Sequence, residues 1–144
     1  MNFNIRKLTL KDIPQVYELG NHRDEFTTEN GSFWTVEQLE SWSKSDNDVM
    51  LVAEDKNKII GFSLYAHHLP TKKVIWENIY ILPKYRNFGV GAALIKNGLE
   101  MVKGLGCKYI MCCVNADDQG HFAKYLKKFG FKTYGTVLWV DKIL

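Results

Sequence analysis

Polar and apolar residues alternate in several segments of the chain, beginning close to the N-terminus, and this period of two predicts half-buried β-strands. In the segments between them, apolar residues recur every three or four positions, as on one side of an amphipathic helix. The expected strands cover residues 3–8, 49–54, 59–67, 74–82, 108–114 and 131–140. Four helices are expected. Two of them begin near Thr9 and Thr35, and the other two cover residues 89–103 and 119–128.

Short polar and helix-breaking residues predict where these elements begin and end. Residues 9–12 and 35–38 resemble capping boxes, in which a threonine and an acidic or amide side chain satisfy the free N–H groups of a helix start. Residues 55–58 are typical of the turn of a β-hairpin. Pro83 should end a strand because it has no N–H to donate, and Gly130 is a natural end for the last helix.

The expected order of elements is strand, helix, helix, three strands, helix, strand, helix, strand, so antiparallel hairpins precede a βαβ unit. Because a βαβ unit requires parallel strands, the fourth and fifth strands should run parallel. The sequence therefore predicts an α/β fold of the α+β type with three layers (α/β/α) and a central mixed, mostly antiparallel sheet. Segment 108–114 is expected to be buried on both faces.

Composition places the chain among ordinary globular domains. It has 144 residues, of which 46% are hydrophobic and 24% charged, and we expect a single domain over residues 1–144. No stretch approaches the roughly 20 apolar residues of a membrane helix, and the alternating N-terminus does not resemble a signal peptide. The expectation is a cytoplasmic protein with no membrane partner.

Charge and cysteine content argue against two further classes of function. Lys and Arg number 19 against 16 Asp and Glu, and this scattered net charge of +3 does not indicate a nucleic-acid partner. The three cysteines, Cys107, Cys112 and Cys113, are interpreted as reduced core residues rather than as a disulfide or a metal site. No set of His, Cys, Asp and Glu has metal-ligand spacing, so no metal is expected.

Residues 79–92 carry the most specific signal: an apolar strand, a basic turn and then a helix start. Gly89 and Gly91 let a ligand approach the backbone closely, and the free N–H groups and dipole of a helix N-terminus attract an anion. Arg86 adds positive charge nearby. The Gly-Lys-Ser/Thr of a Walker loop is absent, and Leu94 stands where a Rossmann fingerprint has its third glycine. The segment therefore predicts a phosphate site of another kind.

This segment closely resembles the acetyl-CoA signature of the GNAT superfamily of N-acetyltransferases, apolar-x-apolar-x-Pro-x-(Tyr/Phe)-(Arg/Gln)-x-x-Gly-x-(Gly/Ala). Residues 127–131 resemble the Lys-x-Gly-Phe that ends the fourth GNAT helix, and the element order is that of a GNAT-like acyl-CoA N-acyltransferase fold. The resemblance implies acetyl-CoA as cosubstrate, with its pantetheine arm on the backbone of Ile79, Tyr80 and Ile81. It also implies that the pyrophosphate lies on the N–H groups of the residues that follow Arg86, namely Asn87, Phe88, Gly89, Val90, Gly91 and Ala92.

The resemblance also points to polar residues around the thioester. Gln119 stands where the family places a residue that touches the pantetheine arm, and Asn115 is the competing candidate. Glu77 stands where many GNAT enzymes place a general base; an exposed strand glutamate in a cross-strand pair is the alternative. The family's general acid is a tyrosine at the position of Leu126, whereas this chain has Tyr125. Tyr125 is thus either that acid on a helix of shifted register, or a core residue with water in its place.

The resemblance implies transfer of an acetyl group from acetyl-CoA to a primary amine, of a small molecule or of a protein. Asp24, Glu25 and Glu29 would favour a cationic acceptor, although a solvated loop explains them equally well. Two other readings stay open. One is a non-catalytic acyl-CoA-binding or regulatory module, which the displaced tyrosine supports; the other is a basic nucleic-acid module, which the scattered charge opposes. A homodimer is compatible with each of them.

Overall fold

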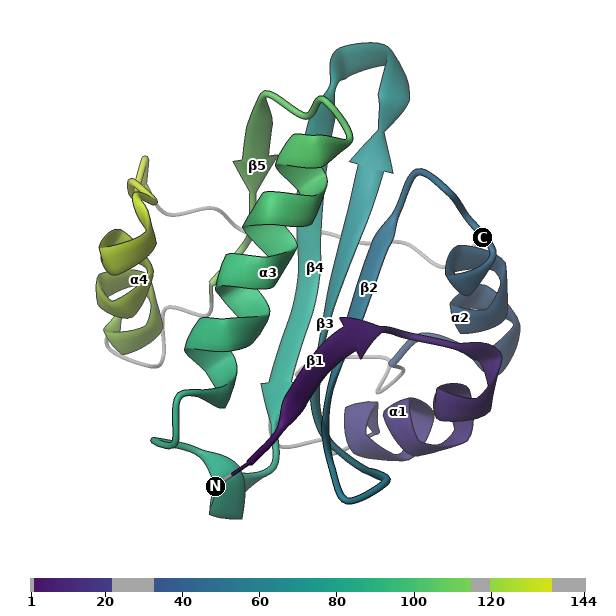
Figure 1. Ribbon diagram of the computed structural model, residues 1–144. Coiled ribbons are helices and arrows are strands. Elements are labelled where there is room, and N and C mark those ends of the chain that lie inside the picture. The colour runs from purple at the N-terminus through teal and green to yellow at the C-terminus, as the bar shows by residue number, and fades with distance from the viewer. Residues whose placement is uncertain (1, 22–32, 115–119, 136–144) are drawn as a thin grey trace. The chain divides into compact units, whose positions relative to one another are not determined.

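The computed structural model describes residues 2–21, 33–114 and 120–135, which belong to two compact units, Met1–Cys112 and Cys113–Leu144 (Figure 1). The strands of the first unit are β1 (Asn4–Lys7), β2 (Val49–Asp55), β3 (Lys58–His68), β4 (Lys73–Ile81) and β5 (Tyr109–Met111). Its helices are α1 (Ile13–Gly20), α2 (Val36–Ser43) and α3 (Val90–Gly104), with 3-10 turns η1 (Leu10–Asp12), η2 (Leu69–Thr71) and η3 (Pro83–Tyr85). The second unit contains α4 (His121–Leu126) and η5 (Lys127–Phe129). A single domain over residues 1–144 stays a prediction.

Local sequence signals account for the ends of several elements. The N–H of Gln38 donates to Thr35 Oγ1 at 3.3 Å and the N–H of Thr35 donates to Gln38 Oε1 at 2.9 Å, which is the predicted capping box of α2. The turn between β2 and β3 places Lys56 and Asn57 at φ values of 49° and 63°, as a two-residue hairpin turn of type I′ requires. Gly130, with φ of 86°, ends η5 in the left-handed conformation that favours glycine.

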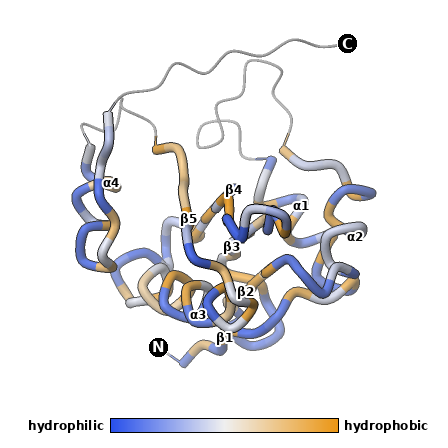
Figure 2. The backbone as a smooth tube through the Cα atoms, turned by 90° about the horizontal axis from the view of Figure 1, so that it is seen from above, coloured by the Kyte–Doolittle hydropathy of each residue, from blue (hydrophilic) through white to orange (hydrophobic). Residues whose placement is uncertain are grey.

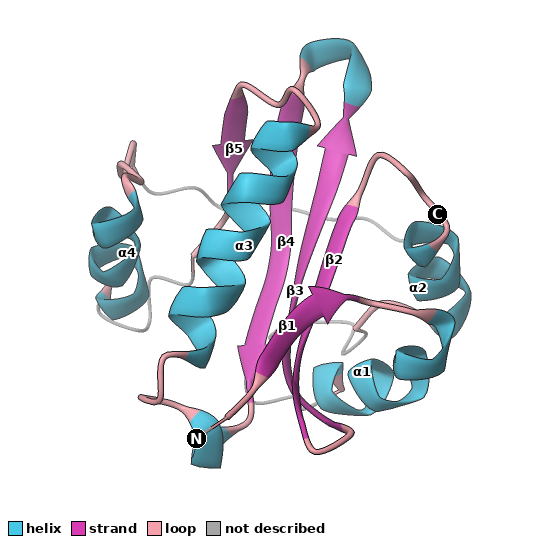
Figure 3. Ribbon diagram, viewed as in Figure 1, coloured by secondary structure: helices cyan, strands magenta, loops and turns pink. Residues whose placement is uncertain are grey.

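The five described strands form one sheet in the order β1-β2-β3-β4-β5 (Figure 3). All neighbouring pairs are antiparallel except β4 and β5, which run parallel through the pairs Lys73 with Tyr109, Val74 with Ile110 and Ile75 with Met111. The mixed, mostly antiparallel sheet and the parallel βαβ unit are therefore confirmed. The crossover through α3 is what allows two parallel strands to be neighbours.

Helices cover both faces of this sheet, which confirms the three predicted layers. Seen from above, α3 lies on one side of the strands and α1 and α2 lie on the other (Figure 2). On the side of α1 and α2, one buried cluster joins helix residues to the β3 side chains Phe62 and Leu64. On the opposite side, Tyr65 of β3 reaches α3, where its hydroxyl donates to the Leu94 carbonyl at 3.5 Å. Successive β3 residues thus pack into different layers, as strand geometry dictates.

Three expectations for the C-terminal part of the chain are wrong in their extent. β5 covers Tyr109–Met111 rather than residues 108–114, and Tyr109 and Met111 are exposed rather than buried. The reason is that β5 borders β4 alone among the described strands, so only one of its edges is paired. Helix 119–128 is reduced to α4 followed by η5. Residues 131–135 lie in no strand, and the remainder of the expected strand 131–140 lies outside the described residues.

The three cysteines are not the core residues that the sequence predicts. Cys107 and Cys112 are half-buried and Cys113 is exposed. Their positions flank the short β5, whose surroundings are more open than the apolar sequence suggests.

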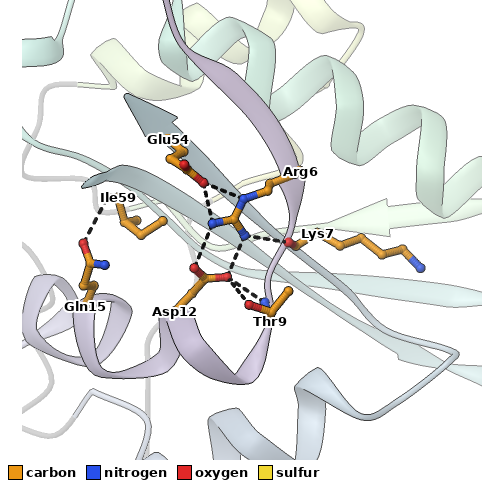
Figure 4. A network of polar contacts seen from close by, with 7 residues as sticks. All are labelled: Arg6, Lys7, Thr9, Asp12, Gln15, Glu54 and Ile59. Atoms are coloured by element: carbon orange, nitrogen blue, oxygen red, sulfur yellow. Dashed lines mark hydrogen bonds and ion pairs between the residues drawn. The ribbon is translucent and has the colours of Figure 1, made fainter. Parts of the chain in front are cut away.

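A network of charged groups ties β1 to the first helical turn and to β2 (Figure 4). The Arg6 guanidinium donates to both carboxylate oxygens of Asp12, at 2.7 and 2.8 Å, and to Glu54 at 2.6 Å. Asp12 also accepts from the N–H and the hydroxyl of Thr9, which closes the predicted capping box. These bonds, led by those from Arg6, lower the pKa of the buried Asp12 carboxyl from 3.8 to about 2.

We expect Asp12→Asn to lower the free energy of unfolding by roughly 2 kcal/mol at neutral pH. Because the folded-state pKa is depressed, this stability is present above the unfolded pKa and disappears as the pH falls from about 4 to about 2. Urea unfolding of both proteins at pH 7, 4 and 2.5 measures the difference. A gap between wild type and variant that is equally large at pH 2.5 and pH 7 would contradict this role of the Arg6 network.

Candidate active site

Glu77 occupies a β-bulge in β4. Leu64 of β3 pairs with Asn78, and the next residue, Tyr65, pairs with Trp76, so Glu77 is the extra residue with no partner across the ladder. A bulge bends its strand and increases the local twist, and it re-aims the side chain of the extra residue. The alternative reading of Glu77 as half of a regular cross-strand pair therefore does not describe this structure.

The bulge coincides with the point where β4 leaves its parallel neighbour. Pairing with β5 ends at Ile75, two residues before Glu77. Beyond it, no described strand borders the β5 side of β4. The Leu82 N–H donates to the Ile60 carbonyl at 2.9 Å, so the backbone N–H of Leu82 faces β3. The Tyr80 carbonyl is directed towards Gly61 and so also faces β3.

Alternate residues of a strand direct their backbone groups to opposite edges, so Ile79 and Ile81 face the edge that β5 leaves open. The Ile81 carbonyl accepts a hydrogen bond from Arg86 Nε at 2.9 Å on that side. Two predicted pantetheine contacts, Ile79 and Ile81, thus lie at an edge that none of the described strands occupies, where an extended ligand could add as a strand does. Tyr80 contributes its ring instead, which packs on Phe62 in the core and lies 5.7 Å from the Arg86 guanidinium.

A compact turn carries the chain from this edge to the start of α3. Pro83 begins η3, and the N–H groups of Tyr85 and Arg86 donate back to the carbonyls of Leu82 and Pro83 at 2.8 and 3.1 Å. The Arg86 side chain then folds back onto β4 through its bond to Ile81. The predicted basic residue therefore holds the turn in place, and its positive charge stays beside the open edge.

The start of α3 has the conformation of an anion site. Asn87 and Gly89 lie in the left-handed region, at φ of 65° and 84°, which turns the backbone into the helix. No side chain of the described residues caps this N-terminus, so the first N–H groups of α3 face outward. A Cβ on Gly91 would lie 3.3 Å from Ile81 Cδ1, which shows how closely the helix start approaches the end of β4. The predicted run from Asn87 to Ala92 therefore lies directly beside the open edge.

The environment of Glu77 suits a proton acceptor. Its side chain is half-buried, and burial raises the pKa of its carboxyl above the ordinary glutamate value. It makes no ion pair among the described residues, so no cation offsets that effect. A carboxylate with a raised pKa binds a proton more readily near neutral pH, as a general base requires.

The remaining predicted residues lie beyond the first unit. Tyr125 belongs to α4 of the second unit, where its ring packs edge-on against Phe129 at 5.4 Å and beside Phe122 at 6.3 Å. Leu126, where the family pattern expects tyrosine, is buried at 2% exposure. Gln119 lies outside the described residues. The structure thus brings Glu77, residues 79–81 and residues 86–92 together, and it describes Tyr125 separately from them.

The described residues meet the requirements of neither a metal site nor a membrane span. Within them, no three His, Cys, Asp or Glu side chains gather as a metal site would require. None of the described helices is both long and apolar enough to span a membrane.

The chain is similar in sequence to curated acetyltransferases. The chain is 29% identical over 102 residues to mycothiol acetyltransferase of Corynebacterium glutamicum. The aligned segment covers 68% of this chain and 34% of that enzyme. It is 25% identical over 141 residues to an uncharacterised N-acetyltransferase of Methanocaldococcus jannaschii, covering 90% and 61% respectively. The chain thus spans between about a third and three fifths of the length of these curated relatives.

Solved structures and a family profile agree with this result. The PaiA N-acetyltransferase of Thermoplasma acidophilum, solved with coenzyme A, superposes with a TM-score of 0.74 at 20% identity over 89% of both chains, which shows a shared fold. The profile described as the acetyltransferase (GNAT) family matches residues 14–131, which is most of the chain and includes β4, the bulge and the start of α3. The chain therefore belongs to the acetyltransferase (GNAT) family.

Proposed function

We propose that this protein transfers an acetyl group from acetyl-CoA to a primary amine. One observation carries the proposal: residues 77–92 form a continuous path in which a half-buried carboxylate, an open strand edge and an uncapped helix start follow one another. An extended, anionic thioester reacting with an amine needs these features in that order. Membership of the GNAT family supports the same chemistry.

The open edge and the helix start would hold the cosubstrate. Backbone groups of Ile79 and Ile81 would pair with the amides of the pantetheine arm as an added strand would. The N–H groups from Asn87 to Ala92 would receive the pyrophosphate, because a helix N-terminus offers free donors and a positive dipole end. The coenzyme A complex of the PaiA enzyme, which has the same fold, supports a CoA ligand here. Gln119 remains a proposed contact to the same arm.

Glu77 would prepare the amine for attack. An alkylammonium group with a pKa near 10.4 is mostly protonated at pH 7 and has no free electron pair. Glu77 takes that proton, directly or through water, and the neutral nitrogen then attacks the thioester carbon. The second proton that the nitrogen loses as the amide forms passes to water. A backbone N–H of the open edge near Ile81 would stabilise the charge that develops on the thioester oxygen.

Collapse of the tetrahedral arrangement breaks the C–S bond, and the electron pair leaves on sulfur. A proton must then reach the departing thiolate, from Tyr125 or from water. The aromatic packing of Tyr125 against Phe122 and Phe129 fits either role, because it fixes the ring without engaging the hydroxyl. Tyr125 is thus proposed as the general acid, with water as the alternative.

The acceptor is proposed to be a small-molecule amine. The curated relative from Corynebacterium glutamicum is named for a small molecule, mycothiol, rather than for a protein substrate. A protein amine remains the alternative. The proposal includes a cytoplasmic location and no nucleic-acid partner, and it is compatible with a homodimer.

Incubation with acetyl-CoA and a panel of amines tests this function. The panel should contain a polyamine, an amino sugar, an amino acid and a lysine peptide, and thiol release is followed with a chromogenic thiol reagent. We expect amine-dependent thiol release with at least one class, together with acetylated product by mass spectrometry. Thermal stabilisation by CoA without turnover on any amine would instead favour the non-catalytic acyl-CoA-binding module.

A further inference from the structure

The direction of the Glu77 side chain depends on how its two neighbours in β4 are held. A bulge residue has no partner on the adjacent strand, so the ladder itself does not fix its orientation. Trp76 and Asn78 flank the bulge and therefore decide where Glu77 points. Both residues are held by side-chain hydrogen bonds in addition to the backbone pairing of the sheet.

On the α3 face of the sheet, three polar groups close a hydrogen-bonded triangle around the bulge. The Trp76 indole N–H donates to Ser63 Oγ at 2.8 Å and to the Asn78 carbonyl at 3.1 Å. The Ser63 hydroxyl in turn donates to the same Asn78 carbonyl at 3.3 Å. Ser63 is fully buried and Trp76 nearly so, at 4% exposure, so these bonds lie away from bulk solvent. The triangle links the residue before Glu77 to the residue after it.

The Trp76 ring that supplies this donor is itself immobilised. It stacks on the ring of Tyr65, with ring centroids 5.5 Å apart and planes inclined by 11°. Tyr65 in turn fills the space above Gly98 of α3, where any added Cβ would overlap its ring. The position of the Trp76 indole is therefore set by the packing of α3 on the sheet.

On the opposite face, the side chain of Asn78 is held from the segment that precedes α2. The Trp34 indole N–H donates to Asn78 Oδ1 at 2.6 Å, and because an indole nitrogen only donates, this bond also fixes the orientation of the amide. Trp34 packs against Trp42 of α2, with ring centroids 4.8 Å apart. Asn78 is thus held from both faces of the sheet. Its backbone carbonyl accepts hydrogen bonds on one face, and its side-chain amide oxygen accepts one on the other.

We propose that Trp34, Ser63 and Trp76, here called the bulge clamp, are positioning residues that lock the β4 bulge and aim Glu77 at the acceptor amine. The inference rests on the proposed role of Glu77 as the base. None of the three side chains touches the reacting atoms; they act through the backbone and side chain of Asn78. If the clamp is released, Glu77 stays in the chain but loses its fixed direction.

Three variants release the clamp while retaining most of the packing: Ser63→Ala, Trp76→Phe and Trp34→Phe. We expect each to lower kcat about 10- to 100-fold, as misplacement of a catalytic group does, and to change the affinity for CoA less than about threefold. Ser43→Ala is the matched control: it makes the same exchange at a half-buried serine whose hydroxyl donates to the Glu40 carbonyl within α2 and not to the bulge. Its kcat should remain that of the wild type.

A double-mutant cycle separates positioning from general loss of structure. In a Glu77→Gln background, Ser63→Ala should have no further effect on kcat, because there is no base left to aim. An equal loss from Ser63→Ala in both backgrounds would overturn the proposal. Wild-type kcat in Glu77→Gln would instead refute the base role under the proposed function and leave the clamp to the next measurement.

That measurement needs no acceptor. The carboxyl carbon of Glu77 is titrated by NMR in protein with labelled glutamate, and the signal is assigned by its absence in Glu77→Gln. Release of the clamp should expose the carboxyl to water and move its titration towards that of the surface glutamates, in Ser63→Ala and Trp76→Phe alike. Ser43→Ala should leave it unchanged. A Glu77 titration identical in wild type and both clamp variants would show that the clamp does not hold this side chain.

Discussion

Replacing Glu77 by glutamine is expected to reduce the rate of acetyl transfer by roughly 10²–10⁴-fold, the usual contribution of a general base. Glutamine keeps the size and polarity of the side chain but cannot accept the proton of the amine. The affinity for acetyl-CoA should barely change, because the proposed contacts of the cosubstrate are backbone groups of β4 and α3. The readout is thiol release under saturating acetyl-CoA, with CoA affinity measured separately by calorimetry.

The pH dependence of this loss has a definite sign. Burial raises the pKa of Glu77, so in the wild type the rate should rise with pH as the carboxyl loses its proton, with an inflection above the ordinary glutamate range. Glu77→Gln should lack this inflection. Its deficit should shrink at high pH, where more of the amine is already neutral.

A matched control for this variant is Glu100→Gln, which makes the same exchange at an exposed position of α3. It should leave the rate and its pH profile unchanged. Wild-type turnover by Glu77→Gln at pH 7 would remove Glu77 from the mechanism. Tyr125→Phe gives a useful comparison, because a large loss there would assign the general acid to Tyr125 and not to water.

The second large effect is expected from Gly91→Val at the start of α3. The added side chain would enter the narrow space between the helix start and Ile81, where the pyrophosphate is proposed to bind. We expect CoA-dependent thermal stabilisation to disappear: a wild-type protein with ligand at about 100 times its Kd gains about 2.7 kcal/mol, or roughly 8 °C. Differential scanning fluorimetry with and without CoA measures this shift.

The same exchange at the other end of the helix provides the control. Gly104→Val lies in α3, has no neighbouring atom within 4 Å of the added Cβ and is far along the chain from the proposed site. It should keep the full CoA-dependent shift. Gly89→Val should also abolish binding, but its φ of 84° strains any valine there, so Gly91→Val is the cleaner probe. Full CoA stabilisation in Gly91→Val would contradict a pyrophosphate site at this helix start.

Much of the fold could be predicted from the sequence because its signals are local. The alternation of 49–54 and 59–67 specified a hairpin, and Lys56 and Asn57 supply the turn between them. The capping box at Thr35 and the helix end at Gly130 are also contained in a few consecutive residues. Local structure of this kind does not depend on the rest of the chain, so the predictions made from it are confirmed by the structure.

The proposed anion-binding part of the site could be predicted for the same reason. Residues 79–92 place a strand end, a turn and a helix start next to each other in sequence, and their order alone brings Ile81, Arg86 and the N-terminus of α3 together. The apolar run 108–114 was misread because its hydrophobicity is local whereas its burial is not. Burial depends on which strands lie beside β5, and that is decided by the assembled sheet.

Tertiary structure alone decided the placement of Glu77. The bulge exists only in the register between β3 and β4, since nothing in the residues around Glu77 marks it as the unpaired one. The groups that hold it come from distant parts of the chain: Ser63 lies across the hairpin, and Trp34 lies 44 positions before Asn78. Local sequence can specify a helix start that binds an anion, because neighbouring residues build it. The direction of a single carboxylate in a sheet requires strand pairing and packing on both faces, which form only when the whole fold does.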